Sequence, residues 1–123
     1  MTMEQFHDIL KRKINQYIHL GYKISREFPK EELYGVTSQL RRAIISIMLN
    51  YVEGYARQRG KVYLSFLETA YGSFKESMYL LEFALDEGYI TESSYREIVA
   101  IGEEIGAMVW RTIEPLRSRI NHD

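Results

Sequence analysis

A chain of 123 residues fits one folded domain over residues 1–123, because compact domains commonly contain roughly 100–150 residues. Cysteine is absent, which excludes disulfides, thiolate nucleophiles and cysteine-ligated metals, and the formal net charge of -1 lacks the basic excess that attracts nucleic acids or acidic membranes non-specifically. No stretch approaches the roughly 18 uninterrupted apolar residues of a membrane span, and the amino terminus lacks the apolar run of a signal peptide. We therefore expect a cytoplasmic protein that does not bind membranes.

Hydrophobic spacing predicts the first two helices. Apolar residues at three- and four-residue steps indicate a helix over about 3–28. Pro29 cannot continue it, because proline lacks the backbone N–H, and the polar residues that follow are expected to form a connection. Thr37 or Ser38 is expected to cap a second helix over about 37–57 by accepting a bond from an N–H of its first turn.

The same spacing predicts two further helices. The third covers about 61–87 and is followed by Gly88, a residue suited to a left-handed cap. Thr91 is expected to cap a fourth helix over about 91–114/120. Pro115 should kink or end that helix near its preceding residue.

The connections between these helices are short, which leaves each helix beside its predecessor. We therefore predict an all-α protein that folds as an antiparallel up-down-up-down four-helix bundle. Gly102 and Gly106 lie one turn apart in the fourth helix, where missing side chains let a neighbouring helix approach closely.

The second helix carries more apolar surface than an ordinary exterior helix. At about 100° per residue its apolar side chains span roughly 200°, about twice the usual width. The arc either lies deep between the other helices or is partly covered by another copy of the chain, because a small monomer would otherwise expose a contiguous apolar patch. We expect a homo-oligomer. The residues predicted for packing or subunit contact are Ile44, Ile47, Met48, Tyr51, Val52 and Tyr55.

A polar row occupies the complementary side of this helix. Its residues follow one another at steps of three and four, so they share one face. We expect the row to face solvent or to form contacts among its own members. It consists of Arg42, Ser46, Asn50, Glu53 and Arg57.

Several runs between residues 28 and 90 carry a family pattern. They are Phe28-Pro29-Lys30, Tyr34-Gly35-Val36, the fairly specific Thr37-Ser38-Gln39-Leu40-Arg41-Arg42-Ala43, then Ser46-Ile47, Asn50, Glu53-Gly54, Phe66-Leu67, Ala70, Gly72-Ser73, Glu76 and Gly88-Tyr89. With these residues the chain resembles the bacterial four-helix bundle family of proteins encoded in intervening sequences of 23S ribosomal RNA genes. Met48-Leu49 stands where the family usually has Pro-Ser, so we expect the second helix to run straighter.

The resemblance implies a bundle that assembles as a homo-oligomer, a pentamer in the family, without an established enzymatic activity. Some relatives are accessory proteins of diversity-generating retroelements, basic rings that bind RNA and a reverse transcriptase. We therefore expect RNA or an RNA-handling protein as partner, and no cofactor or small-molecule substrate.

An up-down course gathers basic residues at one end of the bundle. This end holds the start of the first helix, the turn near residue 60 and the end of the fourth helix, and basic residues, Arg111 included, outnumber acidic ones there by three. In a cyclic oligomer every copy presents this end in the same direction, which makes a ring able to contact several phosphates. Alternatively, the cations form a solvated end that complements helix dipoles. The residues predicted for nucleic-acid binding are Lys11, Arg12, Lys13, Arg57, Arg59, Lys61, Arg117 and Arg119.

Signatures of catalysis or metal binding are sparse. A carboxylate-bridged dimetal bundle needs two Glu-x-x-His units, and only Glu4 and His7 fit, so we expect no metal site. Arg117 and His122 loosely resemble the Arg…His motif of some helical ribonucleases. Three hypotheses therefore remain: an oligomeric scaffold that binds RNA or an RNA-handling protein, a structural or protein-interaction module, and a small helical ribonuclease.

Overall fold

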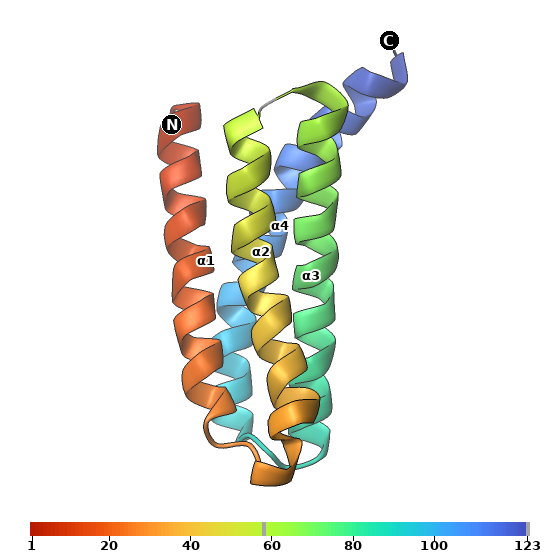
Figure 1. The fold of residues 1–123 in the computed structure, drawn as a ribbon. Coiled ribbons are helices and arrows are strands. Elements are labelled where there is room, and N and C mark those ends of the chain that lie inside the picture. The colour runs from red at the N-terminus through yellow and green to blue at the C-terminus, as the bar shows by residue number, and fades with distance from the viewer. Residues whose placement is uncertain (58, 123) are drawn as a thin grey trace.

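The computed structural model of the chain describes residues 1–57 and 59–122, with only the backbone at residue 122. Its four helices run alternately up and down side by side (Figure 1). Each contacts its neighbour in the chain, and α1 also contacts α4. The predicted all-α up-down bundle is therefore confirmed. The helices are α1 (Met3–Ser25), α2 (Ser38–Arg57), α3 (Gly60–Asp86) and α4 (Glu92–His122).

The first helix begins with a reciprocal cap and ends earlier than predicted. Thr2 Oγ1 accepts a bond from the Gln5 N–H at 3.0 Å, and Gln5 Oε1 accepts one from the Thr2 N–H at 2.7 Å, which satisfies two backbone donors at once. The predicted end at residue 28 is wrong, because the N–H groups of Glu27 and Phe28 bond three residues back rather than four. This tight turn ends the α-helical ladder at Ser25.

The connection to α2 consists of short helical turns with a kink at Gly35, and the predicted cap of α2 is wrong. A 3-10 turn (Lys30–Glu32) leads into a π-helical turn (Leu33–Thr37), which Gly35 interrupts with non-helical angles of φ -111° and ψ -116°. Ser38 already has helical angles of φ -61° and ψ -44°. A capping residue needs an extended backbone, so neither predicted residue can cap here. The hydroxyl of Thr37 is buried without a hydrogen-bond partner among the described residues.

The α3–α4 connection agrees with the sequence. Gly88 has φ +75°, the left-handed conformation that glycine adopts without strain, and the Tyr89 N–H bonds Ala84 O across it at 2.8 Å. Thr91 Oγ1 then accepts a bond from the Ser94 N–H at 3.1 Å, so its predicted role as the cap of α4 is confirmed.

The fourth helix continues through Pro115 to His122, so it agrees with the later of the two predicted ends, near residue 120, and not with the end near Glu114. Proline costs one backbone hydrogen bond, but Pro115 is exposed, where water can satisfy the freed carbonyl. Leu116 packs against the core cluster and Arg117 contacts α3, which together keep the last turns attached to the bundle. In Figure 1 these turns extend past the end of α3.

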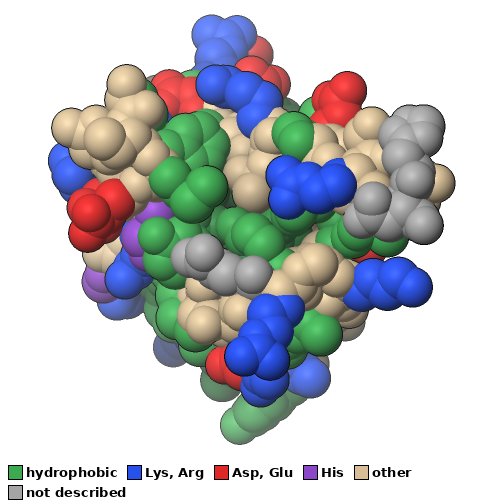
Figure 2. All heavy atoms as spheres, turned by 90° about the horizontal axis from the view of Figure 1, so that it is seen from above, with side chains coloured by type: hydrophobic (Ala, Val, Ile, Leu, Met, Phe, Trp, Pro, Cys, Tyr) green, Lys and Arg blue, Asp and Glu red, His purple; other side chains and the backbone are tan. Residues whose placement is uncertain are grey.

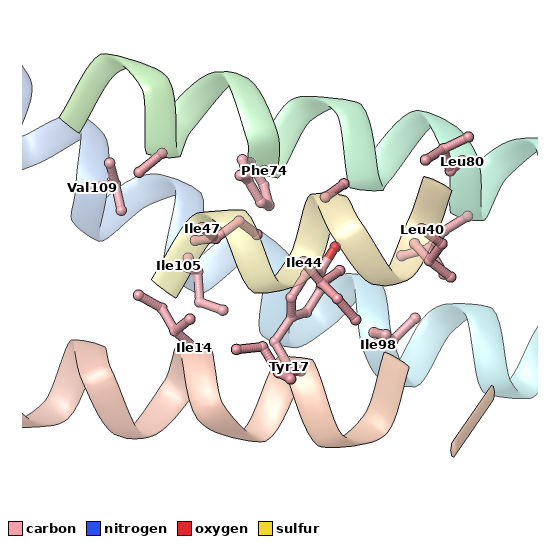
Figure 3. Packing of buried hydrophobic residues seen from close by; sticks show 14 of the residues in the cluster. Ile14, Tyr17, Leu40, Ile44, Ile47, Phe74, Leu80, Ile98, Ile105 and Val109 are labelled. Atoms are coloured by element: carbon pink, nitrogen blue, oxygen red, sulfur yellow. The ribbon is translucent and has the colours of Figure 1, made fainter. Parts of the chain in front are cut away.

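The core lies along the bundle axis and receives side chains from all four helices (Figure 3). Tyr17 is fully buried, and burial raises the pKa of its hydroxyl to about 12. Because Ser77 Oγ donates to Phe74 O at 2.7 Å, the Tyr17 hydroxyl donates to Ser77 Oγ at 2.7 Å, and no polar atom of this pair is left unbonded. Figure 3 labels Ile14, Tyr17, Leu40, Ile44, Ile47, Phe74, Leu80, Ile98, Ile105 and Val109.

The predicted close approach at the α4 glycines is confirmed in part, because neighbouring side chains lie close to both glycines. A Cβ added at Gly106 would lie 2.6 Å from Cε2 of Phe74, and one at Gly102 would lie 3.1 Å from Cε1 of Tyr17. The two glycines therefore make room for aromatic rings of α3 and α1 rather than for a backbone.

Among the described residues, none of the helices combines the length and the hydropathy that a membrane span requires.

Candidate functional site at the basic pole

The basic pole is the end of the bundle where the start of α1, the α2–α3 connection and the last turns of α4 meet (Figure 1). Three of the eight cations predicted for nucleic-acid binding are paired with glutamates of the same chain, which neutralises part of the predicted charge. The pairs are Lys13–Glu104, Arg57–Glu53 with 2.7 Å between Nη2 and Oε1, and Arg117–Glu68 with 2.9 Å between Nε and Oε2.

Two of the paired arginines also lie against aromatic rings. The guanidinium carbon of Arg57 lies 5.6 Å from the centroid of Phe66, and that of Arg117 lies 5.0 Å from the centroid of Trp110. A cation over a ring face is attracted to it, so these contacts add to the ion pairs in fixing both guanidinium groups. Arg57 and Arg117 are therefore less available to an external phosphate than unpaired cations.

Lys11 and Arg12 extend the positive charge along the side of the bundle. Both are exposed, and neither forms an ion pair with any residue that the structure describes. They lie about 12–14 Å along the helix from Met3, at 1.5 Å per residue. The structure therefore separates them from the cations at the end itself.

Four exposed cations remain at the end of the bundle. Arg59 and Lys61 lie at the α2–α3 connection, and Arg111 and Arg119 lie on α4. None of the four forms an ion pair within residues 1–57 and 59–122. Figure 2 shows basic side chains spaced around hydrophobic ones at this end. We call these four residues the end cations.

A cavity of about 520 Å³ opens at the centre of the basic pole, between the start of α1 and the facing parts of the other helices. Its lining combines aromatic side chains with two of the end cations. The aromatic members are Phe6, His7, Tyr51, Tyr55 and Tyr63, and the cationic members are Arg111 and Arg119. We call it the pole cavity.

His7 forms one wall of the pole cavity together with two tyrosines of α2. Its ring stacks on Tyr55 with 3.4 Å between centroids and 11° between planes, and it lies 5.4 Å from Tyr51 with 27° between planes. A hydrogen bond of 2.8 Å joins His7 Nδ1 to the Tyr51 hydroxyl. Burial and the nearby Lys11 lower the pKa of His7, so the imidazole is neutral at neutral pH.

The hydroxyl groups of Tyr51 and Tyr63 in this cavity are also neutral. Burial is the main cause that raises the pKa of both Tyr51 and Tyr63 above the ordinary value of 10.0. Neutral aromatic rings can stack on a planar group. Within the described residues no group of three or more His, Asp or Glu side chains is placed to hold a metal ion.

The sequence profile of the family described as 23S rRNA-intervening sequence protein matches residues 9–111. The chain belongs to this family. The resemblance inferred from the Thr37–Ala43 run is therefore confirmed at the level of this family. No curated protein matches the chain in sequence.

The fold of this 23S rRNA-intervening sequence family chain also occurs in a crystal structure. A protein of unknown function from the S23 ribosomal protein family of Bacteroides thetaiotaomicron is 22% identical, with a TM-score of 0.79 over 85% of this chain and 98% of that chain. At this identity the likeness shows the shared fold alone.

The apolar arc of this intervening-sequence protein divides into a buried and an exposed part. The predicted residues Ile44, Ile47 and Tyr51 are buried in their own chain, so they pack the core and cannot contact a partner. Met48 and Tyr55 are half-buried. Val52 is 41% exposed, and so is available to a second copy.

An apolar stripe lies on the outer face of α2 and includes Leu49, which sequence reasoning did not single out, beside the predicted Val52. Leu49 is 64% exposed, and it shares this face with Val52 because the four members follow at steps of four, three and four residues. We call it the outer stripe, and it consists of Ile45, Leu49, Val52 and Ala56.

The predicted contacts of the polar row are confirmed in part. Asn50 Nδ2 donates to Ser46 O at 2.9 Å and to Ser46 Oγ at 3.0 Å, and Ser46 Oγ is 2.8 Å from Ser73 Oγ of α3. Glu53 pairs with Arg57 one turn later. Arg42 is exposed at the edge of the α2–α3 groove. The row supports the packing of these two helices through the contact between Ser46 and Ser73.

Proposed function

We propose that this intervening-sequence family protein is a cytoplasmic, non-enzymatic, homo-oligomeric scaffold that binds RNA through its basic pole. The observation that carries the proposal is the gathering of the four end cations at one end of the bundle. Exposed guanidinium and ammonium groups without a carboxylate partner are the groups that release counterions when a phosphate chain binds. The near-neutral charge of the whole chain directs such binding to this end.

Self-association multiplies this charge. Leu49 and Val52 expose apolar surface, and the four-three-four steps of the outer stripe match the seam of a helix that packs against another helix. In a cyclic oligomer, a pentamer by the family resemblance, all basic poles face the same way. The ring then presents several sets of end cations to one RNA molecule.

The test compares charge removal at the two ends of the bundle. An Arg59→Ala/Lys61→Ala variant should lower the affinity for a single-stranded RNA by roughly tenfold and reduce the steepness of its salt dependence, because each lost phosphate contact removes a released counterion. The matched control is Lys23→Ala/Lys30→Ala, whose exposed side chains lie at the opposite end. Equal losses in both variants, or undiminished binding in the first, would contradict the proposal.

The protein-interaction hypothesis is the second candidate, and the outer stripe favours it. An apolar face is as suited to a foreign helix as to a second copy. If the purified chain is monomeric and binds no RNA, this alternative replaces the first.

The ribonuclease hypothesis has no supporting observation. The guanidinium of Arg117 is held by Glu68 and lies over Trp110, and the side chain of His122 lies outside the described residues.

A further inference from the structure

The pole cavity has two features that charge alone does not require. Its lining includes a stacked aromatic pair, and its charged side chains are both cationic. His7 and Tyr55 lie face to face, with 3.4 Å between centroids and 11° between planes, and Tyr51 is tilted by 27° from His7. The two rings cover one face of each other, so another planar group can stack on the outer side of the pair. Nucleobases stack on aromatic side chains regardless of sequence, because every base has a π-face.

The charge of the cavity selects for an anion. Arg111 and Arg119 both line it, eight residues apart on α4, which is about 12 Å along the helix. No carboxylate lines the cavity within the described part of the chain. The remaining side chains of the described lining are apolar or neutral, so a bound group with a negative charge meets two guanidinium groups as its charged side-chain partners.

The size and position of the cavity favour one unit of a longer chain. A volume of about 520 Å³ falls within the range of roughly 300–1,000 Å³ for small-molecule sites, which suits a single nucleotide. The cavity opens at the end of the bundle, where Arg59 and Lys61 provide further positive charge beyond its lining. Flanking phosphates of a nucleic acid could therefore continue onto these two residues.

We infer that the pole cavity holds one nucleotide of a single-stranded RNA, with its base stacked on the outer side of the His7–Tyr55 pair and its phosphate against Arg111 and Arg119. The inference rests on the proposed function and adds a base-binding site to it. The end cations outside the cavity contribute charge without sequence information, whereas the cavity requires a planar base.

The test uses two RNA probes of equal length and charge, one with all its bases and one with abasic residues. Binding is measured by fluorescence anisotropy. The wild-type protein should bind the base-bearing probe roughly tenfold more tightly than the abasic probe, since base–aromatic stacking adds affinity that phosphate contacts do not. Tyr55→Leu should abolish this preference while it retains the salt-dependent binding of the abasic probe. Tyr55→Phe, which keeps the ring, should retain the preference.

The outcomes separate this inference from the proposed function. Equal wild-type affinities for the two probes would overturn the base-binding cavity and leave the basic pole intact. Failure to bind either probe would overturn both. If free adenosine monophosphate displaces the labelled RNA at the concentration at which the RNA itself does, the cavity is a mononucleotide site and the assignment to RNA is wrong. Unfolding curves of the Tyr55 variants confirm that each is folded before its binding is compared.

Discussion

His7 links the pH of the solution to the stability of the bundle. Burial and then Lys11 lower its pKa from 6.5, while Asp8 and Glu4 act weakly in the opposite direction. The unfolded chain therefore binds a proton at this residue more readily than the folded chain, so the free energy of unfolding should fall as the pH drops below 6.5.

His7→Gln should flatten this dependence, because glutamine does not titrate. The measurement is urea unfolding from about pH 8 to about pH 5, with His19→Gln as the control at an exposed position. A His7→Gln protein that loses stability on acidification as steeply as the wild type would contradict the role of His7.

Gly106 and Gly72 offer a matched pair of glycine-to-alanine replacements. Alanine gains about 1 kcal/mol over glycine inside a helix, but a Cβ at Gly106 would lie 2.6 Å from the buried Phe74 ring, and such overpacking costs about 1–3 kcal/mol. A Cβ at the exposed Gly72 meets no atom within 4 Å. We expect Gly106→Ala to destabilise and Gly72→Ala to stabilise the protein in thermal unfolding. Stabilisation by both would show that the Phe74 ring moves aside freely.

Among the elements, the α-helices follow from periodicity, whereas some of their ends do not. Gly88 and Thr91 act as predicted because each role depends on local backbone chemistry. The cap expected at Thr37 or Ser38 fails for a different reason: the non-helical residue is Gly35, so both predicted residues already lie inside helical turns. Pro115 is tolerated because its position is exposed, and exposure is a tertiary property that a proline in a sequence does not reveal.

On α2, neighbouring positions have opposite roles, and this gives a test of the outer stripe. Leu49 is 64% exposed, so Leu49→Asp should leave the fold intact but prevent the proposed self-association, as measured by light scattering and circular dichroism. Ile47 is fully buried, so Ile47→Asp should unfold the chain, since an unpaired buried charge costs several kcal/mol. A Leu49→Asp protein with the wild-type mass would exclude this stripe from the subunit contact.

At the scale of the whole molecule, the sequence locates the basic pole, but it predicts neither the ion pairs of its cations nor the pole cavity. An up-down course is enough to place Arg59 and Arg119 at one end. The pairing of Arg117 with Glu68 depends on how α3 and α4 align, which periodicity leaves open. The pole cavity is further from prediction, because His7 and Tyr55 are far apart in the sequence and their stacking depends on the packing of α1 on α2.

The salt dependence of RNA binding by the assembly and by its monomer tests the central claim most directly. The affinity for a single-stranded RNA is measured across a range of salt concentrations for the wild-type protein and for Leu49→Asp. If several basic poles in one ring contact the RNA together, the wild-type affinity falls steeply with salt, and the monomer binds more weakly with a shallower slope. Equal affinities and slopes for the two proteins, or wild-type binding that salt does not change, would contradict a ring of basic poles.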